Sequence, residues 1–321
     1  MSKEYFIAWW NLENLFDVWN SKLRPEWLAK ELKSELKGWT KTVLAKKIFN
    51  LSSIIKKMNL GKGPDLLGVC EVENENVMKM LADSLNLPGR NYKVIHKDTK
   101  DKRGIDIAFI YDENLFSFDG SIFSYEVLKR TATRDLVQVS MKTKSGNEFI
   151  VIGNHWPARS EGQYESEPYR MMVGETLSYW MHRIFEIRSD KIPVLVMGDF
   201  NDEPYNRSLT EYALATQNKD KTLRGRNPYL WNVSWSLLEE SGTYFFGSDK
   251  LTLDQIMVTK GFFIDESKLK IDASSLRVES YKGLTDKNGK AIRYSRPSEG
   301  NEFNQNGFSD HLPVSVKIIE S

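Results

Sequence analysis

The sequence predicts an α/β fold in which strands and helices follow one another without a regular alternation. Six apolar runs typical of strands each stop at a polar cluster: DLLGVCEVEN, IDIAFIYD, FIVIGNHWPAR, IPVLVMGDFND, LDQIMVT and DHLPVSVKI. Residues 194–197 are apolar at successive positions, as in strands that are covered on both faces. Amphipathic patterns at residues 25–58, 75–86 and 166–188 predict helices. This irregular order favours neither a simple barrel nor a doubly wound sheet.

The first predicted strand, residues 5–12 in FIAWWNLENLFD, carries polar residues at its end. The period of two in a β-strand places Asn11 and Glu13 on the same side, where the strand opens into a loop. That position suits a ligand site. By the same alternation, Cys70 should point away from the polar Glu71 and lie in the core. Near the other end of the chain, residues 275–308 are rich in Gly, Ser, Asn and Lys and predict a long loop before the last strand.

The composition excludes several classes of protein without favouring a class of partner. Of the 321 residues 40% are hydrophobic, and the net charge is +1. No apolar stretch approaches the ~20 residues that span a bilayer, so we expect no membrane insertion. A single cysteine rules out an internal disulfide framework, and no secretory signal is present, so we expect a cytoplasmic location. We also expect a monomer with one domain over residues 1–321.

Acids, amides and imidazoles end the separate apolar runs. The residues in these positions are Asn11, Glu13, Glu71, Asn154, His155, Asp199, Asn201, Asp254, Asp310 and His311. Any one of them alone is more often a turn or capping residue, but turn chemistry does not explain the same design at six strand ends. Carboxylate and amide oxygens suit Mg²⁺ or Mn²⁺. Dispersed histidines without a cysteine cluster are a weak zinc signature.

Seven short motifs follow one another in order along nearly the whole chain. They are NLEN at 11–14, CEVEN at 70–74, KRGIDIAFIYD at 102–112, GNHWPAR at 153–159, GDFNDEP at 198–204, LDQIMV at 253–258 and SDHLPV at 309–314. Together they resemble the endonuclease/exonuclease/phosphatase superfamily, also called DNase I-like, and look most like a bacterial branch of it. The resemblance implies a four-layer α/β/β/α sandwich of the α+β class. Two mixed β-sheets would pack face to face between outer helices, with the active-site loops along one edge.

The resemblance also implies a metal site. Glu71 would be the first ligand of Mg²⁺ or Mn²⁺, with Glu13 and Asp310 nearby. Asn11 would help through its amide oxygen or a bound water. Some relatives have Asp where Glu13 stands, so the contact between Glu13 and the metal could be longer or mediated by water.

The remaining site residues would handle the water and the phosphate. By resemblance, Asp199 and Asn201 would orient the attacking water and hold the phosphate. Asp254 would fix the tautomer of His311, which is either the general base or a cationic phosphate clamp; Asp199 is the rival base. His155 would contact the phosphate from the opposite side. Candidates for binding substrate are Asn154, Arg103 and Arg159, although surface or structural ion pairs explain the two arginines nearly as well.

The expected activity is that of a metal-dependent phosphodiesterase, a nuclease that hydrolyses DNA or, alternatively, RNA. A phospholipid, inositol phosphate or other small phosphoester is the alternative substrate, because one core serves all of these in the family. A non-catalytic binding protein with this fold is a further alternative. The lysine-rich residues 22–57 are either a nucleic-acid arm or, as we favour, an outer helical layer with Trp27 and Trp39 packed inward.

Overall fold

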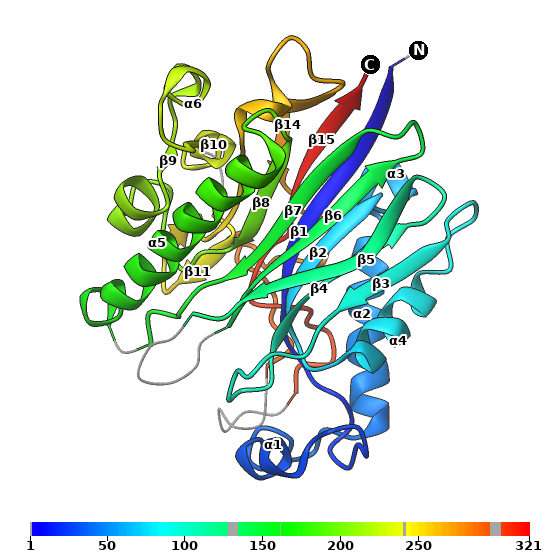
Figure 1. Ribbon diagram of the computed structural model, residues 1–321. Coiled ribbons are helices and arrows are strands. Elements are labelled where there is room, and N and C mark those ends of the chain that lie inside the picture. Colours follow the sequence, from blue (N-terminus) through cyan, green and yellow to red (C-terminus); the bar gives the residue numbers. More distant parts are fainter. Residues whose placement is uncertain (1, 128–133, 161, 240–241, 296–302) are drawn as a thin grey trace.

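Two β-sheets pack face to face and carry helices on their outer faces, which confirms the predicted four-layer α+β sandwich (Figure 1). The computed structural model describes residues 2–127, 134–160, 162–239, 242–295 and 303–321. The first sheet has the order β14 (Leu269–Val278), β15 (Val314–Glu320), β1 (Lys3–Leu15), β2 (Leu66–Val72), β4 (Asp106–Asp112), β3 (Tyr92–His96). The second has the order β5 (Phe116–Tyr125), β6 (Leu136–Thr143), β7 (Glu148–His155), β8 (Val194–Asp199), β13 (Asp254–Val258), β10 (Leu230–Asn232), β9 (Ala215–Thr216).

The other elements cover the two sheets or join their strands. A separate hairpin consists of β11 (Tyr244–Phe246) and β12 (Asp249–Leu251). The α-helices are α1 (Glu26–Glu31), α2 (Lys41–Ile55), α3 (Met58–Gly61), α4 (Glu75–Leu85), α5 (Gln163–Arg188) and α6 (Lys219–Arg224). Short π-helical and 3-10 turns are η1 (Ser208–Tyr212), η2 (Val233–Leu237) and η3 (Lys260–Phe262).

Both sheets are mixed, and their pairing brings the motif residues to one edge. Strand β1 runs parallel to β2 and antiparallel to β15. In the other sheet β7 runs parallel to β8, which is antiparallel to β13. The ends of β1, β2, β7 and β8 therefore lie beside the starts of β13 and β15, at the edge opposite the chain termini (Figure 1). In register, Asp199 pairs with both His155 and Asp254.

Alternation along the strands divides the apolar residues among the layers. Trp9 on β1 faces the second sheet, whereas its neighbour Trp10 faces the helices. The core between the sheets includes Ile7, Val139, Val151, Met197 and Ile256. Helices α2 and α4 cover the outer face of the first sheet, and α5 covers the second. Thr40 and Asn74 cap α2 and α4, because each side chain accepts a hydrogen bond from a backbone N–H in the first turn.

Residues 25–58, which the pattern predicts to be helical, do not form one helix. Helix α1 ends at Glu31 and α2 begins after Thr40, with Gly38 at φ 76° between them. That left-handed conformation suits glycine and interrupts the helix. Trp39 is buried and donates from Nε1 to the Phe16 carbonyl, whereas Trp27 is 46% exposed. The expectation of inward packing is therefore correct for Trp39 and wrong for Trp27.

The predicted loop at residues 275–308 begins later than expected. Strand β14 continues to Val278, because its pairing with β15 resumes at residues 277–278 after a register shift. Residues 279–295 then run without a strand of a sheet. The part of the prediction that concerns residues 296–302 lies outside the described residues.

Gly198 on β8 is required by a close backbone approach. A Cβ placed there would lie 2.4 Å from the carbonyl oxygen of Asn154 on the neighbouring strand β7. We expect Gly198→Ala to lower the free energy of unfolding by about 1–3 kcal/mol, because two central strands must move apart. Urea unfolding followed by circular dichroism measures this change. The exposed Ser117→Ala on β5 is the control, and an unchanged midpoint for Gly198→Ala would contradict the prediction.

Candidate active site

One cavity of about 550 Å³ lies at the edge where these strand ends meet. The sequence-predicted residues that line it are Asn11, Glu71, Arg103, His155, Arg159, Asp199, Asn201, Asp310 and His311. Asp254 lies directly behind His311, with its carboxylate buried. Glu13 and Asn154 are buried but are not among the lining residues. The structure thus brings most of the predicted site together and separates these two residues from the cavity surface.

Backbone irregularities at the ends of β1 and β2 decide which side chains reach the cavity. Pairing between β1 and β2 shifts register after Asn11, and Glu13 and Asn14 adopt φ 51° and 56°. Pairing between β2 and β4 shifts around Glu71, which has φ 62°. Because such bulges re-aim side chains, the alternation that predicted Asn11 and Glu13 on one side does not hold here. The Glu71 carboxylate enters the cavity, whereas Glu13 turns away from it.

Cys70 is a buried core residue, as predicted, but it lies close to the site. Its sulfur lies within 4.8 Å of ligand atoms of His155 and Asp199. Burial raises the pKa of the Cys70 thiol well above its ordinary value, and neighbouring carboxylates raise it further. The thiol is therefore protonated and unreactive at neutral pH.

His311 is held by a buried carboxylate and by two tryptophans. Its Nδ1 lies 2.7 Å from Oδ2 of Asp254. Trp9 donates from Nε1 to Oδ1 of Asp254 at 3.2 Å, and Trp10 donates to the His311 carbonyl at 2.8 Å. Burial alone would lower the pKa of His311, but the carboxylates of Asp254 and Asp199 outweigh it and raise the pKa well above the ordinary value. The ring is therefore an oriented imidazolium.

Asp199 stands between two imidazoles at the base of the cavity. Its Oδ2 accepts from Asn11 Nδ2 at 3.0 Å and lies 3.7 Å from His155 Nε2 and 3.8 Å from His311 Nε2. Its Oδ1 accepts from the Asn201 N–H at 3.0 Å. Burial raises the pKa of Asp199 to about 7. A carboxylate with a pKa in this range can exchange a proton near neutral pH.

His155, the second imidazole beside Asp199 in the cavity, is neutral. Burial lowers the pKa of His155 well below its ordinary value, and the Arg134 and Arg103 guanidinium groups lower it further. Its Nε2 lies 3.6 Å from Oε1 of Glu71. Within the described part of the chain, its buried Nδ1 has no hydrogen-bond partner.

The cavity offers a set of oxygen donors that fits a hard divalent cation. Glu71 and Asp310 present carboxylates to it, and Asn11 presents an amide. The Asn11 Oδ1 already accepts from the Glu13 N–H at 2.9 Å, which leaves one lone pair of that oxygen. Mg²⁺ and Mn²⁺ use few protein carboxylates and keep several waters, so this small set suits them.

Of the residues that the structure describes, four arginines line the cavity, and two of them were not predicted. Arg103 donates from Nη2 to Oδ1 of Asn14 at 2.8 Å. Arg159 donates to the Asn201 carbonyl and pairs with Asp202, so it also braces the loop after β8. The sequence interpretation missed Arg134 and Arg293, which line the same cavity. Neither stands at the end of an apolar run, which was the signal used.

An apolar wall closes one side of the cavity. Tyr244, Phe246, Leu251 and Leu253 form it, from the hairpin β11–β12 and the residues that follow. The Tyr244 ring lies 4.8 Å from the His311 ring, centroid to centroid.

Asn154, which was predicted to bind substrate, is buried and does not line the cavity. Its Oδ1 accepts from Trp156 Nε1 at 3.0 Å, and its Nδ2 donates to the Ile152 carbonyl at 3.1 Å. Alternation along β7 explains this placement, because His155 faces the cavity and the adjacent Asn154 faces the other side.

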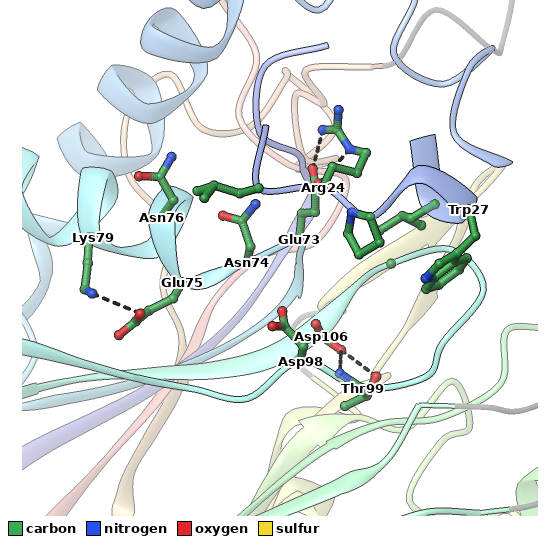
Figure 2. Close-up of a pocket in the computed structure, with 14 residues that line it drawn as sticks. Arg24, Trp27, Glu73, Asn74, Glu75, Asn76, Lys79, Asp98, Thr99 and Asp106 are labelled. Atoms are coloured by element: carbon green, nitrogen blue, oxygen red, sulfur yellow. Dashed lines mark hydrogen bonds and ion pairs between the residues drawn. The ribbon is translucent and has the colours of Figure 1, made fainter. Parts of the chain in front are cut away.

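Figure 2 shows a second cavity, of about 420 Å³, which Asp98, Thr99 and Gly104 of the loop between β3 and β4 help to line. Its lining contains none of the predicted site residues within the described ranges. Most of its acidic groups have partners: Glu73 pairs with Arg24, Glu75 with Lys79, and Asp106 accepts two hydrogen bonds from Thr99. The first cavity is therefore the candidate active site.

A two-sheet sandwich gathers carboxylates, imidazoles and arginines in one cavity at its edge, and these are groups that phosphoester hydrolysis can use. The chain belongs to the endonuclease/exonuclease/phosphatase family, whose model matches residues 6–320. No curated protein matches the chain significantly.

Solved structures of low sequence identity share the fold. An endonuclease/exonuclease/phosphatase family protein from Bacteroides thetaiotaomicron is 15% identical, with a TM-score of 0.59 over 100% of this chain and 96% of that one. A mannosyl-6-phosphatase from the same organism is 17% identical, with a TM-score of 0.56 over 98% and 99%. Truncated TDP2 from Caenorhabditis elegans is 13% identical, with a TM-score of 0.57 over 98% and 97%.

Proposed function

We propose that the protein is a metal-dependent phosphodiesterase, and specifically a nuclease that hydrolyses DNA by attack of an activated water. The observation that carries this proposal is the position of Asp199. Its carboxylate lies between the imidazoles of His155 and His311 in a cavity that Glu71 and Asp310 also line. A water held beside Asp199 would have this carboxylate as its proton acceptor, and His311 and the arginines of the lining supply positive charge for the phosphate.

The residues divide the chemistry as follows. Glu71 and Asp310 would hold Mg²⁺ or Mn²⁺, with the Asn11 amide oxygen beside them. When bound, such an ion stabilises negative charge on the phosphate oxygens. Asp199 accepts the proton of the attacking water at Oδ2, and Asn201 keeps the carboxylate oriented through its N–H. His311, held as an imidazolium by Asp254, binds a nonbridging oxygen, and neutral His155 contacts the phosphate from the opposite wall.

Cleavage assays test this proposal. Supercoiled plasmid, linear duplex and single-stranded DNA are incubated with Mg²⁺ or Mn²⁺, and EDTA, Asp199→Ala and His311→Ala serve as controls. We expect metal-dependent cleavage that EDTA and both variants abolish. Intact DNA in the presence of bound metal would refute the nuclease proposal.

A small phosphoester is the second candidate substrate, because an apolar wall bounds the cavity. The hairpin β11–β12 contributes Phe246 and Leu251 to the lining, where they offer apolar surface to a small organic phosphoester. One structural relative, moreover, is a mannosyl-6-phosphatase. Phosphate release from sugar phosphates, inositol phosphates and nucleotides, assayed beside the DNA substrates, distinguishes the two candidates. A non-catalytic role is disfavoured because the sequence contains every residue to which the proposed chemistry assigns a role.

The lysines of the segment 22–57 are expected to contribute little to DNA affinity. Lys33, Lys37 and Lys41 are exposed on the α1–α2 segment and do not line the active cavity. We expect the triple replacement of these lysines by Glu to leave the dependence of DNA affinity on salt unchanged. Each lysine that contacts a phosphate would contribute about 0.9 to the slope of log K against log salt. A slope that falls by that amount for each lysine replaced would show that this segment contacts the DNA backbone.

Three expectations about the whole protein stay predictions, namely the cytoplasmic location, the monomeric state and the single domain over residues 1–321. For the described residues, no helix combines the length and apolar character needed to cross a membrane.

A further inference from the structure

Glu13 and Asn14 form the bulge near the end of β1, here named the Glu13–Asn14 turn, which has an unusual backbone and a buried support. Both residues have positive φ, 51° and 56°, at the end of β1. The fully buried Lys47 of α2 donates from Nζ to the Glu13 carbonyl. Its ammonium also lies 5.7 Å from the Trp39 ring centroid and 5.3 Å from that of Tyr294. A strained turn persists when its surroundings hold it, and strain of this kind gathers at functional sites.

The Glu13 side chain is committed to another segment of the chain. Its carboxylate accepts from Arg293 Nε at 2.7 Å and from the backbone N–H groups of Tyr294 and Ser295 at 2.9 and 3.3 Å. The side chain is 1% exposed. Arg293 in turn lines the active cavity, and its Nη2 lies 3.6 Å from Oδ2 of Asp310. These contacts hold the Glu13 carboxylate toward residues 293–295, and Glu13 is not among the residues that line the cavity.

Asn14 contacts a second cavity arginine, Arg103, and the carboxylate of Glu71. Its Oδ1 accepts from Nη2 of Arg103, which also lines the cavity. Its backbone N–H donates to Oε2 of Glu71 at 2.9 Å. One two-residue turn is therefore bonded to two cavity arginines and to the predicted metal ligand Glu71.

We propose that the Glu13–Asn14 turn is a positioning element, in which Glu13 holds Arg293 and Asn14 holds Arg103 so that both guanidinium groups face the phosphate of the substrate. Glu13 is then not a metal ligand. The inference rests on the proposed function in taking a phosphate as the bound anion. A guanidinium fixed by a carboxylate or amide loses less rotational freedom on binding, which strengthens its contact with phosphate.

Two titrations of the purified full chain test the inference without turnover. The probes are Mn²⁺ alone and inorganic phosphate in the presence of saturating Mn²⁺, each followed by calorimetry. We expect Glu13→Gln to raise the phosphate Kd about tenfold, as for loss of a charge-assisted hydrogen bond, and to leave the Mn²⁺ Kd unchanged. Glu71→Gln should instead raise the Mn²⁺ Kd. Glu113→Gln, on an exposed surface carboxylate, is the matched control for both titrations.

Double variants show whether the turn acts through the arginines. If Glu13 only holds Arg293, the double variant Glu13→Gln with Arg293→Gln binds phosphate no more weakly than Arg293→Gln alone. The pair Asn14→Ala and Arg103→Gln should behave in the same way. Arg293→Gln must itself weaken phosphate binding. If the variants of the buried Glu13–Arg293 pair do not fold, the Asn14 and Arg103 variants carry the test.

Three outcomes would overturn the inference. They are a loss of Mn²⁺ affinity in Glu13→Gln that matches Glu71→Gln, additive effects in the double variants, and no measurable phosphate binding by the wild type. Failure of the proposed function has a different signature, because these titrations need no cleavage. Intact DNA together with the expected Kd pattern would refute the nuclease and leave the positioning role in place.

Discussion

Asp199→Asn is expected to lower kcat by roughly 10²–10⁴-fold, the range typical of general acid–base catalysis. The amide has the shape of the carboxylate but cannot take a proton from the attacking water. Substrate binding should change less, because Asn11 and Asn201 remain in place beside residue 199. Steady-state kinetics on the substrate identified by the cleavage assays measures the loss. The exposed Asp119→Asn in β5 is the matched control, and wild-type kcat in Asp199→Asn would exclude Asp199 as the base.

The pH dependence of activity provides a second readout for Asp199. A base acts only when it is deprotonated, and burial raises the pKa of Asp199 from 3.8 to about 7 in the metal-free protein. We therefore expect kcat/KM of the wild type to rise with pH. If bound metal lowers the pKa of Asp199, the rising limb of the pH profile lies below pH 7. Asp199→Asn should lack that limb. An identical limb in the variant would assign it to another group.

The same shift has a consequence for stability in EDTA. Between pH 3.8 and about 7 the folded protein binds a proton at Asp199 that the unfolded chain has released, so this group makes stability fall as pH rises. Above about pH 7 the whole cost of the buried charge is present. Asp199→Asn removes that cost, and its melting temperature should exceed that of the wild type more at pH 8 than at pH 4.

The second large effect is expected on breaking the pair between Asp254 and His311. Asp254→Asn removes the carboxylate that keeps His311 charged, so the His311 pKa should fall and the cation should be lost near neutral pH. We expect kcat to fall by roughly 10²–10⁴-fold, as when a catalytic histidine is in the wrong protonation state. Removing one partner of a buried ion pair also costs stability, about 3–5 kcal/mol. Assays should therefore run well below the melting temperature of each variant.

A double variant and NMR separate the role of Asp254 from a general loss of folding. If Asp254 acts only through His311, the double variant Asp254→Asn with His311→Gln should be no slower than His311→Gln alone. The imidazole signals of His311 should report a protonated ring in the wild type and a neutral ring in Asp254→Asn at pH 7.5. Additive losses, or a ring that stays protonated, would show that Asp254 does not set the charge of His311.

Much of the site could be predicted because its residues stand where apolar runs end. Asn11, Glu71 and Asp199 lie near the ends of strands that lead to one edge, and Asp310 with His311 precedes the strand that returns from it. Polar residues at strand ends are visible in a linear sequence, whatever the order of the strands in the sheet. The arginines that face them are not, because Arg134 and Arg293 occupy segments without periodicity.

The sequence by itself determined the mixture of strands and helices and the polar groups at the ends of apolar runs, because both follow from local patterns. The resemblance of its ordered motifs to a known family added the α+β sandwich and the shared edge. Only the tertiary structure decided how these polar groups divide into cavity groups and supports. Bulges at Glu13 and Glu71 cancel the strand alternation, and they turn Glu13 toward Arg293, 280 positions away in the chain. Bulges depend on pairing between strands and on buried partners such as Lys47. The periodic pattern along a single strand predicts neither.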